Sequence, residues 1–96
     1  MKDFEVDFEA QFKLDVEAQV RWLEDEHPDW VPKLESGLLD AFSLLASFPL
    51  AGAGVRAPLR KLLLHKLPLV IWYVAEEENA RVRLLCLFHA RQKRLR

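Results

Sequence analysis

The sequence predicts an α+β domain in which two helices cover one face of an antiparallel sheet. Residues 67–75 form an uncharged apolar segment, two further apolar segments at 59–65 and 81–89 flank it, and two stretches with helical periodicity precede all three. Short connections between strands require antiparallel neighbours. Helices that are separate in sequence from such a meander pack on one of its faces.

The segment at 67–75, Leu-Pro-Leu-Val-Ile-Trp-Tyr-Val-Ala, organises this prediction. It is rich in β-branched and aromatic residues and ends at a run of three glutamates. A bilayer-spanning helix needs about 20 apolar residues, so this segment is too short to be one. An uninterrupted apolar strand is typical of a central strand buried on both faces. We therefore expect Trp72, Tyr73 and Cys86 of the next strand to lie in the core.

The first residues favour an edge strand followed by a helix. Phe4, Val6 and Phe8 alternate with acidic residues, as in a half-buried strand. The alternation formally continues to Trp22, but a strand of that length would be exceptional. A stripe at helical spacing fits the same region, and Pro28 ends it. We expect a strand at 3–9 and a helix at 10–26.

A second helix is expected at 30–47, with Asp29 as its N-cap and Pro32 in its first turn. Its apolar face is wider than one sheet contact requires. Two interpretations stay open: the helix is simply well buried, or it keeps a groove for a partner. The apolar positions at the helical period are Trp30, Leu34, Leu38, Ala41, Leu45 and Phe48, and those that widen the face are Leu39, Phe42 and Leu44.

The remaining elements follow from Pro, Gly and strand signals. Residues 48–58 are expected to form a loop because they are rich in Pro and Gly. A single domain over 1–96 is expected, made of a strand at 3–9, helices at 10–26 and 30–47, strands at 59–65, 68–76 and 81–89, and a basic tail at 90–96.

The net charge of −1 hides an asymmetry between the two halves of the chain. Residues 1–48 hold 4 Lys and Arg against 12 Asp and Glu, whereas residues 49–96 hold 10 against 3. A basic half of this kind is typical of proteins that bind a polyanion or an acidic partner. Alternatively, the two halves pack together and neutralise each other.

Several site classes are not expected. The lone Cys86 cannot form an internal disulfide, and the N-terminal residues lack the features of a signal peptide, so a cytoplasmic protein is the simplest expectation. His27, His65 and His89 are scattered over different elements, which argues against a metal site. Gly52-Ala-Gly54 is too short for a nucleotide-binding loop. We expect no cofactor, no small-molecule ligand and no membrane contact.

The end of the last strand carries the candidate chemistry. His89 and Arg91 are two residues apart, so on a continuing strand they share a face. Arg60 and Arg83 lie on the strands flanking the central one and could join them. Histidine titrates near neutral pH, and arginine binds phosphate through paired hydrogen bonds.

In this order of parts the chain resembles the RelE/ParE superfamily of bacterial toxins. The resemblance rests on Leu-Ala-Ser-Phe-Pro at 45–49, Leu-Arg-Lys at 59–61, Pro-Leu-Val-Ile-Trp-Tyr-Val at 68–74 and Leu-Leu-Cys-Leu-Phe-His-Ala-Arg at 84–91. It implies a toxin neutralised by an antitoxin encoded beside it. The wide apolar face of the second helix and the basic C-terminal half predict that the antitoxin's C-terminal segment is amphipathic and partly acidic. One branch of the family cleaves messenger RNA on the ribosome, and the other poisons DNA gyrase.

The resemblance also implies site residues. In a nuclease, His89 and Arg91 would be catalytic. Target-binding residues would be Arg60, Arg83, Arg91, Lys93 and Arg94, and antitoxin-binding residues would be Leu38, Phe42 and Leu45. Some nucleases of the family carry a Tyr near the chain end, but here no Tyr follows Tyr73, and no acidic residue follows Glu78. These departures favour the gyrase-poisoning branch, with the ribosome-dependent endoribonuclease and a small non-toxic binding protein as alternatives.

Overall fold

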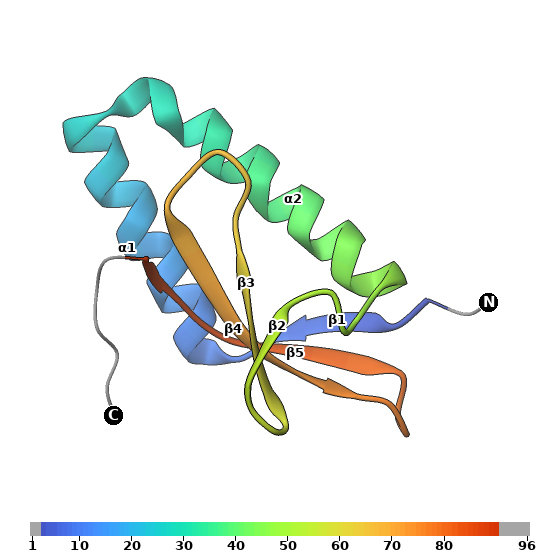
Figure 1. The fold of residues 1–96 in the computed structure, drawn as a ribbon. Coiled ribbons are helices and arrows are strands. Elements are labelled where there is room, and N and C mark those ends of the chain that lie inside the picture. Colours follow the sequence, from blue (N-terminus) through green and yellow to red (C-terminus); the bar gives the residue numbers. More distant parts are fainter. Residues whose placement is uncertain (1–2, 91–96) are drawn as a thin grey trace.

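A computed structural model describes residues 3–90 and shows two helices packed side by side on one face of a sheet (Figure 1). Helix α1 spans Ala10–Glu26, a short 3-10 helix η1 spans Pro28–Trp30, and helix α2 spans Val31–Ser47. The strands are β1 (Glu5–Phe8), β2 (Ala53–Arg56), β3 (Leu59–Leu63), β4 (Leu69–Glu76) and β5 (Arg81–His89). The predicted α+β class is confirmed.

The sheet has five strands in the order β1-β5-β4-β3-β2. Strand β4 is central, as its uninterrupted apolar sequence predicts. Strands β2 to β5 form an antiparallel series, and β1 is added parallel to β5 at one edge. A parallel neighbour requires a long crossover, which the two helices between β1 and the meander provide.

The core lies between the helices and one face of the sheet. Tyr73, Ile71, Val82 and Leu84 of the central strands are fully buried there, together with Phe12 and Leu23 of α1. Side chains alternate between the two faces of a strand. Trp72 and Phe88 therefore lie on the face opposite the helices, where their rings meet edge to face with centroids 5.3 Å apart.

Burial of the central strand changes along its length. Leu69, Val70 and Ile71 are buried, but Trp72 and residues 74–76 are only half-buried. The expectation that the strand is buried on both faces is therefore wrong for its second half, because no helix within residues 3–90 covers the opposite face there. Cys86, also expected in the core, is half-buried on that same face.

Two local expectations are wrong. Residues 53–56, expected in a loop, form the exposed edge strand β2, which pairs with β3 through a register shift beside Gly54. Asp29 does not cap α2, because it lies inside η1, and η1 runs directly into the helix. The N-cap of α2 is Trp30, without a side-chain hydrogen bond. Within residues 3–90, no helix is both long and apolar enough to span a membrane.

Candidate functional site

The chain turns sharply where α2 ends, and residues 48–52, which we call the corner, connect the helix to β2. The corner is held from behind by two side chains of the sheet. The Gly52 N–H donates a hydrogen bond to Tyr73 Oη at 2.8 Å. Arg60 Nη1 donates to the Gly52 carbonyl oxygen at 2.7 Å and to that of Leu50 at 3.4 Å. The backbone of the corner is therefore fixed to strands β3 and β4.

Gly52 is required at this close approach. A Cβ atom there would lie 2.5 Å from the Lys61 carbonyl oxygen and 2.7 Å from Tyr73 Oη. Both atoms are fixed by the sheet, so neither can give way easily. Burial raises the pKa of the Tyr73 hydroxyl above its usual 10.0, although the Gly52 hydrogen bond and the Arg60 charge oppose this shift. The hydroxyl therefore stays neutral and accepts the Gly52 hydrogen bond at physiological pH.

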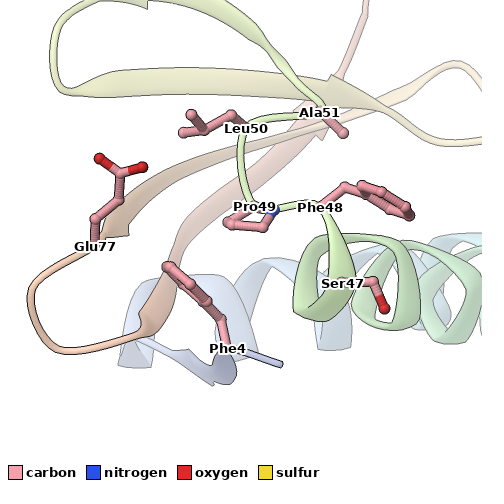
Figure 2. Close-up of a pocket in the computed structure, with 7 residues that line it drawn as sticks. All are labelled: Phe4, Ser47, Phe48, Pro49, Leu50, Ala51 and Glu77. Atoms are coloured by element: carbon pink, nitrogen blue, oxygen red, sulfur yellow. The ribbon is translucent and has the colours of Figure 1, made fainter. Parts of the chain in front are cut away.

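The fixed corner presents apolar side chains to solvent. Phe48 is 62% exposed and Leu50 is 48% exposed, although both are large. Figure 2 shows Phe4, Pro49, Leu50 and Glu77 around one hollow of about 500 Å³, in which Glu77 is the charged lining residue. The remaining lining residues are Ser47, Phe48 and Ala51.

A second group of charged side chains joins β1, β4 and β5. Arg83 Nη2 lies 2.8 Å from Glu9 Oε2, and Arg83 Nη1 lies 3.1 Å from Glu76 Oε2. Arg81 pairs with Glu5 at 3.6 Å and with Asp7 at 3.3 Å. We call these two arginines and four carboxylates the edge ladder.

The edge ladder explains part of the charge asymmetry. The hydrogen bond with Arg83 lowers the pKa of the Glu76 carboxyl below its usual 4.5. The hydrogen bonds with Glu9 and Glu76 raise the pKa of the Arg83 guanidinium. Three of the four ion pairs connect the acidic N-terminal half with the basic C-terminal half. The halves therefore do neutralise each other in part.

Comparison with known structures assigns the fold. The chromosomal ParDE TA system from P. aeruginosa matches with a TM-score of 0.69 at 14% identity, covering 90% of this chain and 95% of that chain. The toxin–antitoxin complex RelBE2 from Mycobacterium tuberculosis matches with a TM-score of 0.65 at 20% identity, covering 93% of each chain. The isolated RelE toxin of E. coli matches with a TM-score of 0.60 at 15% identity, covering 95% and 88%.

The chain has the RelE/ParE fold. The match extends over nearly the whole of each chain, so the edge strand, the helix pair and the meander all take part in it. No protein-family model and no curated protein matches the sequence.

On this RelE/ParE fold the predicted site residues do not form one cluster. In the strand register, Arg60 pairs with Tyr73 of β4, and Arg83 pairs with Val74. His89 pairs with Leu69, at the other end of β4. Leu69 and Tyr73 are four positions apart on the strand, a distance of about 13 Å. Arg60 and Arg83 also lie on opposite faces of the sheet, because their partners on β4 are consecutive residues. The expectation that both join His89 is wrong.

His89 lies at the other end of the sheet, beside the helices. It lines a small apolar pocket with Trp22, Trp30 and Leu69. This pocket lies on the helix side of the sheet, away from the guanidinium of Arg83. Arg91, Lys93 and Arg94 fall outside the described residues 3–90. Within that range, no group of His, Cys, Asp and Glu could hold a metal ion.

The residues expected to bind an antitoxin are mostly internal. Leu45 is fully buried, Leu38 is 9% exposed, and Phe42 is half-buried against the Phe12 ring. Leu38 and Leu45 belong to the core because they face the sheet, so neither can contact a partner without unfolding α2. The sequence did not lead us to expect an exposed apolar surface at the corner. The available signal was that Phe48 and Leu50, both large and apolar, stand in a Pro- and Gly-rich segment.

Proposed function

We propose that the chain is the toxin of a toxin–antitoxin pair and that an antitoxin encoded beside it holds it inactive. The observation that carries this proposal is the whole-chain likeness to three structures, all of which are described as toxins or toxin–antitoxin assemblies. The sequence motifs that resemble the RelE/ParE superfamily support it independently. The target we propose is DNA gyrase, which the toxin would bind without chemistry of its own.

The arrangement of polar groups supports binding over cleavage. Cleaving RNA requires a base, an acid and a phosphate clamp within reach of one scissile phosphate. Within residues 3–90, Arg60 binds backbone carbonyl oxygens, and Arg83 binds two carboxylates on the opposite face of the sheet. His89 lies on the same face as Arg60, but it lines an apolar pocket about 13 Å away along the strands. The sheet separates Arg83 from the other two groups, and distance along the strand separates Arg60 from His89, so the three do not converge on one phosphate.

Ribosome-dependent cleavage of messenger RNA is the second candidate. The sequence favours it, because His89 is followed closely by Arg91, Lys93 and Arg94, so an acid–base group and cations are neighbours in the chain. In either mechanism we propose Arg91 as the main contact to the target. Arg60 and Arg83 remain candidate target contacts, although both already bind partners within the chain.

Two assays with the purified protein separate the candidates. Supercoiling by gyrase should be inhibited, while transcripts on translating ribosomes should stay intact. Arg91→Ala should fold normally and lose the inhibition, because the change removes the cation that we propose as the main contact to the target. Cleavage of ribosome-bound transcripts, together with normal supercoiling, would replace the gyrase proposal with the nuclease one.

His89→Ala distinguishes the same candidates by magnitude. A general acid or base contributes about 100- to 10,000-fold to a reaction rate. A nuclease that uses His89 should lose activity on that scale, whereas gyrase inhibition should weaken only slightly. Thermal melts of both variants control for folding.

A further inference from the structure

The exposed apolar residues of the corner are unusual because the backbone that carries them is fixed. A mobile loop could fold its apolar side chains inward, but the contacts of Tyr73 and Arg60 with Gly52 prevent this. The Ala51 N–H also donates to the Phe48 carbonyl oxygen at 3.0 Å, which closes the turn. A rigid surface that presents large apolar side chains is typical of an interaction site, because binding then costs little ordering entropy.

The charge around the corner hollow limits what can bind there. Glu77 lines the hollow, the exposed Glu78 follows it, and Asp3 is exposed near the lining residue Phe4. Arg60 donates to corner carbonyl oxygens from behind, and Arg81 pairs with Glu5 and Asp7, so both cations are already engaged. An acidic rim repels nucleic acid and attracts Lys or Arg.

We propose that the corner hollow binds an apolar side chain of the antitoxin and that Glu77 selects a segment carrying Lys or Arg beside that side chain. This inference rests on the proposed function and adds the chemistry of the partner. The basic half of the toxin implies acidic residues in the antitoxin segment, whereas the corner requires an apolar anchor next to a cation. An antitoxin segment that meets both requirements carries its acidic residues in one part and its apolar anchor, with the adjacent cation, in another part.

A second copy of the chain fits the hollow less well. A symmetric dimer places the same patch of each subunit face to face, which would bring the two acidic rims together. A stable interface also buries about 800 Å² on each partner. A hollow of about 500 Å³ suits an inserted side chain rather than a broad flat contact.

The test measures the affinity of the purified antitoxin, encoded by the neighbouring reading frame, for purified variants of the toxin. Leu50→Ser removes the apolar wall and should weaken binding about 30-fold, the effect of losing one anchor residue. Glu77→Lys should weaken binding about 10-fold at low salt, and less at about 0.5 M NaCl. Exchanging the antitoxin's Lys or Arg for Glu should restore binding to Glu77→Lys.

Leu14→Ser is the matched control. Leu14 is 57% exposed on α1 and does not line the hollow. This variant removes a similar apolar side chain away from the hollow, so its affinity should stay within about twofold of the parent. Thermal melts show whether each variant folds, and Glu77→Lys changes only an exposed turn.

The outcomes separate the two proposals. If the unaltered toxin does not bind the antitoxin, the proposed function is wrong, and this inference is wrong with it. If the unaltered toxin binds but folded Leu50→Ser and Glu77→Lys bind equally well, only this inference is overturned. It is also overturned if Leu50→Ser loses gyrase inhibition while keeping antitoxin affinity, or if it dissociates a homodimer of the unaltered protein.

Discussion

The corner and the edge ladder both depend on arginines of the sheet, but they use them in different ways. Arg60 donates to backbone carbonyl oxygens behind an apolar turn, and it works together with the buried Tyr73 hydroxyl. Arg81 and Arg83 pair with side-chain carboxylates that are themselves partly exposed to water. The first arrangement fixes backbone geometry, whereas the second balances charge between the two halves of the chain.

The difference shows why residue type alone does not identify a binding site. All three arginines lie on strands of the sheet, and any of them could contact a polyanion. Exposed ion pairs contribute little to stability and are screened by salt. The buried hydrogen bond from the Gly52 N–H to the Tyr73 hydroxyl is costly to break because it leaves a buried polar group without a partner. We therefore expect the corner to be sensitive to substitution and the edge ladder to be tolerant.

The largest expected effect is that of Gly52→Ala. The added Cβ would overlap the Lys61 carbonyl oxygen and the Tyr73 hydroxyl, so the corner must shift. Overpacking of this kind costs about 1–3 kcal/mol in the free energy of unfolding, and we expect the upper end of that range. Gly54→Ala is the control, because nothing lies within 4 Å of its Cβ position. Equal urea midpoints for the two variants would show that the corner is not tightly packed.

Tyr73→Phe should have the next largest effect. The substitution keeps the buried ring but leaves the Gly52 N–H without its acceptor, which costs about 1–3 kcal/mol. Urea unfolding at neutral pH measures this loss. A difference of less than about 0.5 kcal/mol would mean that water or another group replaces the hydroxyl.

The same variant should change the alkaline limb of the stability profile. The pKa of Tyr73 is raised in the folded protein, so above pH 10.0 the unfolded chain ionises first. Stability is then lost as pH rises from that value through the folded pKa. Tyr73 is the one tyrosine in the sequence, so tyrosinate absorbance reports this group directly. Tyr73→Phe should lose less stability between pH 9 and 12 than the parent.

The smallest effect is expected in the edge ladder with Glu76→Gln. The pKa of Glu76 is lowered in the folded protein, so its contribution is present above 4.5 and is lost as pH falls through the folded pKa. The parent should therefore lose more stability than Glu76→Gln as the solution is acidified below that value. Added salt should reduce the difference between the two. If the parent and Glu76→Gln lose equal stability on acidification in low salt, the ion pair of Glu76 does not contribute to stability.

Local sequence patterns predicted most of the fold. The helical stripe ending at Pro28 placed the first helix at 10–26, which matches Ala10–Glu26, and the uncharged run at 67–75 identified the central strand. Strand β2 escaped prediction because it is four residues long, contains Gly54 and is exposed on every residue. Such a strand has no alternation of buried and exposed positions, so its sequence resembles that of a loop.

The site was less predictable because its contacts are distant in sequence. Arg83 meets Glu9 across 74 residues, and Gly52 meets Tyr73 across 21. No local pattern encodes such partners. The expectation that Arg60 and Arg83 join His89 failed because strand register determines which residues are neighbours, and register was not apparent from composition. Leu38 and Leu45 were assigned to a partner because helical periodicity does not distinguish a face buried in the core from one kept for another protein.

The central claim is that this RelE/ParE fold acts as a toxin controlled by its neighbour. The most direct measurement is the growth of cells that express the chain alone and of cells that also express the adjacent reading frame. We expect growth to stop in the first case and to recover in the second, with the two proteins purifying as one complex. Normal growth of cells that accumulate the folded protein alone would contradict this account.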